Sequence, residues 1–99
     1  MKSKRTKALD IPKSVKDKVF QRDGGRCIIC GSYNAMPNSH YISRAKSGLG
    51  IEQNIVTMCI NCHNDFDNTT KRAELMPFVR AYLDIHYPDF KDSERIYKK

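Results

Sequence analysis

The chain has 99 residues, of which 18 are Lys or Arg and 11 are Asp or Glu, so its formal net charge is +7. This length predicts one domain, whose apolar core alone is expected to be marginal. No stretch reaches transmembrane length and the N-terminus lacks the apolar region of a secretory signal, so a cytoplasmic protein without a membrane partner is predicted. Clustered basic residues indicate a nucleic-acid-binding protein, although a solvated basic surface has the same composition.

The chain begins with a basic segment, which a helix follows. Residues 1–9 are predicted to form a flexible arm that reaches phosphate groups beyond the folded domain. The positively charged side chains of this arm are Lys2, Lys4, Arg5 and Lys7. An apolar stripe with four-residue spacing predicts an amphipathic helix over residues 11–23, and two glycines are expected to end it.

Two Cys-x-x-Cys pairs are the most specific motifs of the chain. Their members are Cys27, Cys30, Cys59 and Cys62. Four thiolates complete the tetrahedral shell of a structural zinc ion, and such an ion would offset a marginal core. Two disulfides would also use four cysteines, but a reducing cytoplasm favours free thiols and metal. Because a closed zinc shell has no open position, any reaction must use other groups.

Two strands are predicted between and around the cysteine pairs. Residues 40–43 and 54–58 are rich in β-forming side chains. The segment that joins them, residues 43–53, is a polar loop with two glycines and is too long for a tight turn.

Two further helices complete the predicted elements. One covers residues 60–68, and a second begins at Pro77 and ends before Pro88, because proline is tolerated only in a first turn. Residues 87–99 are expected to form a polar tail. Three aromatic side chains are expected to pack around the cysteine knuckle: Tyr33, Tyr41 and Phe66.

The motifs HYISR, NIVTMC and CINCH, behind Cys-x-x-Cys-Gly, resemble those of the HNH endonuclease family, most of all its small phage and bacterial members. The match covers roughly residues 15–68. The resemblance implies a small α+β domain, a ββα-metal (His-Me) finger with a zinc knuckle, flanked by N- and C-terminal helices. It implies a nuclease domain over residues 10–99, with a core over about 15–68 and a C-terminal helical extension over 69–99.

The resemblance also implies roles for individual residues. His40 matches the general base that activates water, and Asn54 matches the residue that ties the loop and orients the base. His63 and Asp67, at i and i+4 of a helix, match ligands of a catalytic magnesium, manganese or other divalent ion. Ser39 stands where many members have a carboxylate or a second histidine. Either it acts through a water molecule, or fewer protein groups hold the metal.

DNA is the implied partner, and Arg44 and Lys46 are expected to contact phosphate together with the arm. The residues leave alternatives open: His63 as a zinc ligand in place of Cys62, or Asp67 as a solvated carboxylate. At the level of the whole chain, the alternatives are a non-catalytic zinc-stabilised DNA-binding module and an accessory subunit of a phage packaging (terminase or portal) or recombination machine. A monomer is assumed.

Overall fold

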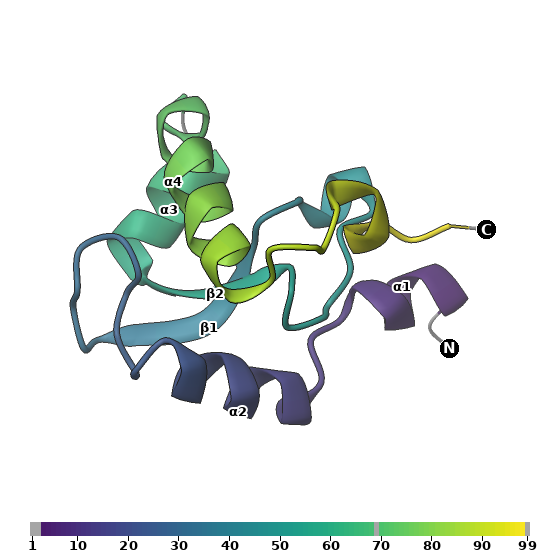
Figure 1. The fold of residues 1–99 in the computed structure, drawn as a ribbon, viewed down its shortest axis with the longest axis horizontal. Coiled ribbons are helices and arrows are strands. Elements are labelled where there is room, and N and C mark those ends of the chain that lie inside the picture. The colour runs from purple at the N-terminus through teal and green to yellow at the C-terminus, as the bar shows by residue number, and fades with distance from the viewer. Residues whose placement is uncertain (1–2, 69, 99) are drawn as a thin grey trace.

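The computed structural model describes residues 3–68 and 70–98. Its elements in chain order are α1 (Lys4–Leu9), α2 (Lys13–Arg22), β1 (Ala35–His40), the 3-10 helix η1 (Arg44–Lys46), β2 (Ile55–Cys59), α3 (Ile60–Asn68), α4 (Arg72–His86) and the 3-10 helix η2 (Asp92–Arg95). The two strands form an antiparallel sheet that lies between α2 on one side and α3 with α4 on the other (Figure 1). The predicted small α+β single domain is confirmed. None of the helices in the described ranges is long and apolar enough to cross a membrane.

β1 lies earlier in the chain than predicted. It spans Ala35–His40, so the predicted strand over residues 40–43 is wrong except for its first residue. The register pairs His40 with Ile55 and is irregular between Met36 and Ser39. Pro37 lies in this irregular stretch, where its missing N–H interrupts the ladder. The segment has low β propensity, and it forms a strand because β2 offers a partner.

The other local predictions fare better. The expected strand and the expected helices around β2, α2 and α3 are confirmed, and each observed boundary lies within two residues of the expected one. α4 ends before Pro88 as predicted, but it begins at Arg72 and contains Pro77 in its interior. The residues that extend it upstream, RAELM, are mostly strong helix formers, which explains the earlier start.

The core is centred on β2, all of whose residues are buried. The buried cluster around it consists of Cys27, Ala35, Tyr41, Val56, Met58, Cys59, Phe66, Val79 and Leu83. Tyr41 and Phe66 therefore pack beside the cysteines as predicted. Tyr33 does not, because it is 70% exposed and lies under the guanidinium of Arg26 instead.

A buried polar network joins α2 to β2 and α4. The Asp23 carboxylate accepts bonds from Tyr82 Oη at 2.5 Å and from the Thr57 amide at 2.9 Å, and it pairs with Arg22 at 2.7 Å. Burial and the bond to Asp23 raise the pKa of Tyr82 to about 12. The network fixes the helices on both sides of the sheet relative to the strand that precedes the second cysteine pair.

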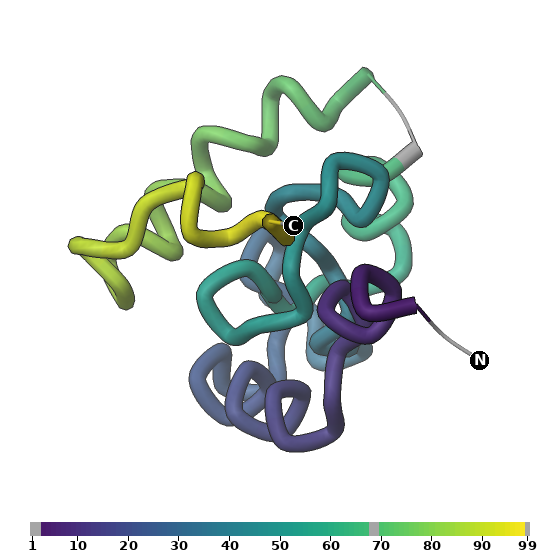
Figure 2. The backbone as a smooth tube through the Cα atoms, turned by 90° about the vertical axis from the view of Figure 1, so that its right-hand side faces the viewer, coloured from purple at the N-terminus to yellow at the C-terminus, as the bar shows by residue number. Residues whose placement is uncertain are grey.

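Both ends of the described chain are ordered against the loop between the strands. Residues 4–9, predicted as a flexible arm, form helix α1, in which Ser3 Oγ caps the Thr6 amide and Leu9 is buried. The predicted tail contains η2 with the buried Arg95, and Ile96 pairs with Gly48. Figure 2 shows α1 and the C-terminal segment on the same side of the molecule, the side that faces the viewer. The flexible-arm prediction treated a charged segment as solvated, and the polar-tail prediction did not include η2, whereas each segment buries one side chain that anchors it, Leu9 and Arg95 respectively.

Candidate functional site

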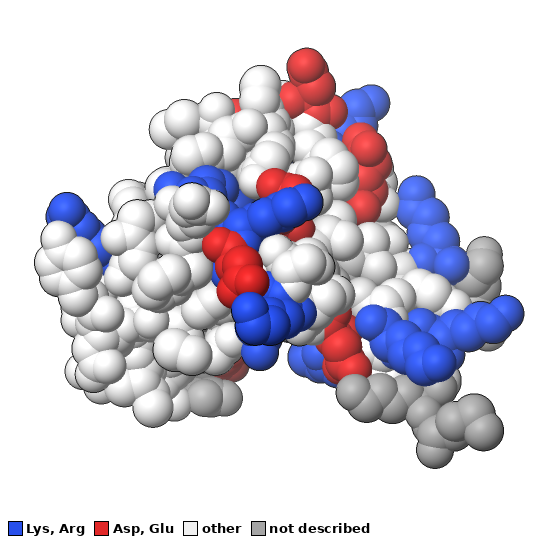
Figure 3. Space-filling view, turned by 90° about the horizontal axis from the view of Figure 1, so that it is seen from below, with Lys and Arg blue, Asp and Glu red and all other residues white. Residues whose placement is uncertain are grey.

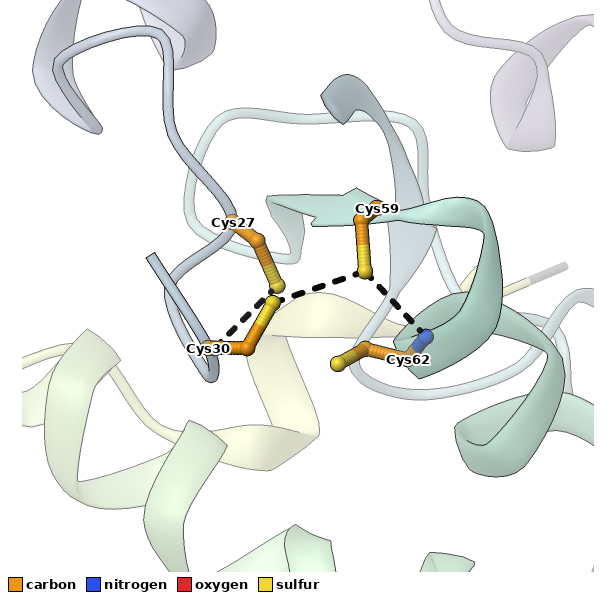
Figure 4. A group of neighbouring side chains, drawn as sticks. All are labelled: Cys27, Cys30, Cys59 and Cys62. Carbon is orange, nitrogen blue, oxygen red and sulfur yellow. Dashed lines mark hydrogen bonds between the residues drawn. The ribbon is translucent and has the colours of Figure 1, made fainter. Parts of the chain in front are cut away.

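The four cysteines meet between the turn after α2 and the β2–α3 junction (Figure 4). Their sulfur atoms all lie within 4.8 Å of one another, and Cys30 Sγ is 3.6 Å from Cys59 Sγ. Four thiolates around zinc at about 2.3 Å place sulfur atoms roughly 3.8 Å apart, so this donor set fits a tetrahedral ion. All four cysteines are free of disulfides. The cluster could hold a metal, consistent with a structural zinc knuckle.

Backbone amides point at two of the sulfurs. The amide of Cys30 donates to Cys27 Sγ at 3.5 Å, and the amide of Cys62 donates to Cys59 Sγ at 3.4 Å. Burial raises the pKa of Cys27, but backbone N–H groups outweigh it and lower this pKa to about 7. Burial and the neighbouring thiols raise the pKa of Cys62. Four adjacent thiolates repel one another unless a cation is bound, so the cluster suits a metal better than a set of free thiols.

A second site is a cleft of about 840 Å³, and His63, one of the residues that line it, directly follows Cys62 in the sequence. Five residues singled out in the sequence line it: His40, Arg44, Lys46, His63 and Asp67. β1, η1 and α3 therefore bring the expected base, the expected metal ligands and two expected phosphate contacts to one place.

His40 is the last residue of β1 and is 7% exposed. Its Nε2 lies 2.9 Å from the carbonyl oxygen of Leu9 at the end of α1. A carbonyl oxygen can only accept, so Nε2 carries the proton and Nδ1 is the free acceptor of the neutral ring. Burial lowers the pKa of His40, and the positive charge of Arg44 adds to this, while the bond to Leu9 opposes it. The imidazole is therefore neutral at neutral pH.

His63 and Asp67 face each other one turn apart on α3, with His63 Nε2 2.5 Å from Asp67 Oδ2. Arg72 approaches the other carboxylate oxygen of Asp67 at 3.3 Å and donates to Tyr41 O at 2.7 Å. Both members of the pair are about one-third exposed. Cys62, not His63, lies with the other three cysteines. Asp67 is paired rather than free in solvent.

Asn54 is fully buried and ties the loop to the end of β1. Its Oδ1 accepts from the Ile42 amide at 2.8 Å, and its Nδ2 donates to Ile42 O at 3.1 Å and to Leu49 O at 2.9 Å. Gly48 packs so closely here that an added Cβ would lie 1.7 Å from Ile42 O. Asn54 thus shapes the loop that carries Arg44 and Lys46, beside the cleft rather than in its lining.

The neighbours of His40 in β1 face opposite ways, as strand geometry requires. Asn38 lines the cleft with His40, and its Oδ1 is buried without a partner among the described residues. Ser39 is fully buried, and its Oγ also has no partner within the described part of the chain. Ser39 is therefore turned away from the cleft that holds His63 and Asp67.

The basic residues of the predicted arm are placed by α1. Arg5 donates to Arg44 O at 3.0 Å and to Ser47 Oγ at 3.2 Å, so it is bonded to the loop. Lys4 and Lys7 are exposed, and Lys2 lies outside the described residues. Figure 3 shows Lys and Arg side chains gathered at the end of the molecule where α1 lies.

The cleft residues that were not anticipated include four with charged or amide side chains: Asp10, Lys16, Asn38 and Arg72. The two-residue period of a strand could have identified Asn38 from His40, had the strand been placed correctly. The other three come from segments whose docking depends on contacts distant in sequence, and no local pattern marks them.

Neither a family model nor a curated protein sequence matches this chain. The resemblance to HNH endonucleases therefore rests on the motifs of the chain itself.

Proposed function

We propose that this protein is a metal-dependent endonuclease of HNH type that hydrolyses phosphodiester bonds in DNA. The observation that carries the proposal is the shared cleft: a buried neutral His40 lies in one cavity with the His63–Asp67 pair and with Arg44 and Lys46. General base, metal donors and phosphate-binding cations are the groups that this hydrolysis needs.

In the proposed reaction, His40 Nδ1 takes the proton of a water molecule as its oxygen attacks phosphorus and the bond to the leaving 3′ oxygen breaks. The proton on Nε2, bonded to Leu9, leaves Nδ1 free for this role. Arg44 and Lys46 supply positive charge for the phosphate.

His63 and Asp67 are the residues that would hold the catalytic ion. The carboxylate oxygen of Asp67 suits magnesium or manganese. The imidazole nitrogen of His63 favours manganese of these two ions. Such an ion would neutralise charge on the phosphate and on the leaving oxygen. We assign the second metal, zinc, to the four cysteines because a complete thiolate shell is typical of a structural zinc site.

The decisive experiment measures nicking of supercoiled plasmid with and without added manganese. His40→Ala should lower the rate by about two to four orders of magnitude while zinc content and DNA binding are kept. His86→Ala is the matched control, since the chain has three histidines and exposed His86 lies near the end of α4, with its ring tilted against that of Tyr82, and does not line the cleft. Equal rates for His40→Ala and wild type would refute the proposed mechanism.

Two observations favour a second candidate, a non-catalytic zinc-stabilised DNA-binding module. Asp67 is already bonded to His63 and Arg72, and Ser39 is turned away from the cleft, so few groups remain to bind a catalytic ion. DNA binding without cutting at any manganese concentration would select this candidate. Cutting that appears only beside a packaging or recombination enzyme would select the accessory-subunit alternative.

A further inference from the structure

We propose that the N-terminal segment, residues 3–10, is an integral part of the active site. The backbone carbonyl of Leu9 positions the imidazole of His40, and the absence of a side chain at Gly50 allows the segment that carries this carbonyl to pack against the loop. The effect on cleavage rests on the proposed endonuclease function, whereas the positioning of the imidazole does not. Leu9 is thus a positioning residue that acts through its main chain.

The contact has two donors on one acceptor. Leu9 O lies 2.9 Å from His40 Nε2 and 2.9 Å from Arg44 Nη1. Because the carbonyl accepts from both, it orients the imidazole ring of His40 and the guanidinium of Arg44 together. The carbonyl itself cannot drift, since the Leu9 side chain is 2% exposed and packs in the interior.

The loop between the strands is shaped to receive this segment. The Gly50 amide donates to Ala8 O at 3.0 Å. A Cβ added at Gly50 would lie 1.9 Å from Asp10 O and 3.0 Å from Leu9 O, which no side chain permits. The requirement for glycine at this position therefore comes from the close approach of the N-terminal backbone.

Polar contacts to the loop residues that precede Gly50 hold the same segment. Arg44 pairs with Asp10 at 2.7 Å, and Arg5 donates to Ser47 Oγ and to Arg44 O. A segment that served only to carry positive charge to DNA would need none of these contacts. Their convergence on His40 and Arg44 indicates a positioning role.

The test uses the full chain with zinc retained and compares Gly50→Ala with wild type. NMR of the imidazole should show an exchange-protected Nε2–H proton of His40 in wild type, which Gly50→Ala should lose because α1 can no longer seat. The turnover number on plasmid should fall by roughly 10- to 100-fold, by analogy with the loss of a group that orients a metal-ligating histidine. The KM for DNA should change less, because every positive charge of α1 is still present.

Gly24→Ala is the matched control. Gly24 has φ of +69°, so alanine strains the backbone, but its added Cβ would meet nothing within 4 Å. This variant should lower the stability and leave the protected proton and the turnover number unchanged below its unfolding temperature.

Asp10→Ala provides a second variant in case Gly50→Ala loses zinc or fails to fold. It removes a partly exposed carboxylate and adds no atom, and it should increase exchange of the same proton by releasing the end of α1 from Arg44. Persistence of the fully protected proton in every folded variant would overturn the proposal. If wild type does not cut DNA at all, the endonuclease proposal fails, but the proton measurement still decides the role of Leu9.

Discussion

Replacement of Asn54 by alanine should destabilise the fold strongly, because this side chain is the main tie between the loop and the end of β1. It makes three hydrogen bonds, accepting one from the Ile42 amide and donating one each to Ile42 O and Leu49 O. At about 1 kcal/mol net for each bond, Asn54→Ala should lower the free energy of unfolding by roughly 3 kcal/mol. For a domain of this size, that corresponds to a fall in Tm of about 10–25 °C.

Asn54→Asp sharpens the test because it keeps the shape and the acceptor. Its second oxygen would replace Nδ2 and face two carbonyl oxygens, at the positions now 3.1 Å and 2.9 Å away. Those oxygens and burial would raise the pKa of the introduced carboxyl, since only the protonated form can donate to a carbonyl. A folded-state pKa above the unfolded value means that stability is present at low pH and is lost as pH rises. Asn54→Asp should therefore be least stable at pH 7 and recover toward pH 5.

The assay is denaturant-induced unfolding of the zinc-loaded protein, followed by circular dichroism. Gln21→Ala is the control, because it deletes an exposed carboxamide from α2. A loss below about 1 kcal/mol for Asn54→Ala, or no difference in pH dependence between Asn54→Asp and wild type, would contradict the hydrogen-bonding account of this residue.

Three further outcomes are expected. Elemental analysis should find one zinc per chain. Replacement of any of the four cysteines by serine should unfold the protein, because the marginal core depends on the metal. A stable fold without zinc would exclude a structural zinc site. His63→Ala should abolish manganese-dependent cutting and keep zinc, while Asp67→Ala should mainly raise the manganese concentration needed; zinc lost with His63 would move that residue to the cysteine site. The rise of the cleavage rate with pH at fixed manganese should have its midpoint below the ordinary histidine pKa of 6.5, since burial lowers the pKa of His40. A rate that still rises steeply between pH 7 and 8 would count against His40 as the base. The same lowered pKa means that the contribution of His40 to the stability of the fold is present above pH 6.5 and is lost as the pH falls.

The sequence predicts those elements whose signal is contained in a few neighbouring residues. α2 follows from an apolar stripe, β2 from a run of β-forming residues, and the cysteine cluster from its Cys-x-x-Cys spacing. β1 could not be predicted in the same way, because its segment contains Pro37 and Asn38 and forms a strand only by pairing with β2.

The residues of the candidate site also divide into those that a local motif identifies and those that only the fold brings to the cleft. The motifs identify His40, His63 and Asp67, which share one cleft. Arg72 and Asp10 could not be identified, because each reaches the cleft through a backbone or side-chain partner far away in sequence: Arg72 through Tyr41 O, Asp10 through Arg44. The most consequential error concerned α1. A short segment with several charges has the composition of a solvated arm. The close approach of its backbone to Gly50, on a loop distant in sequence, shows that it packs against the domain.

The loop between the strands is held from three directions, which explains why residues 4–9 and 92–96 are ordered in so small a domain. Asn54 ties it to the end of β1, α1 bonds it through Gly50, and the C-terminal segment bonds it through Leu49, whose amide donates to Arg95 O at 2.8 Å. Within residues 3–68 and 70–98 the sheet has two strands, so it offers little surface against which such a loop could pack. The ends of the chain supply that surface. Because this loop carries both Arg44 and Gly50, and Gly50 receives the segment whose Leu9 O contacts His40, the order of that N-terminal segment and the geometry around His40 depend on the same contacts.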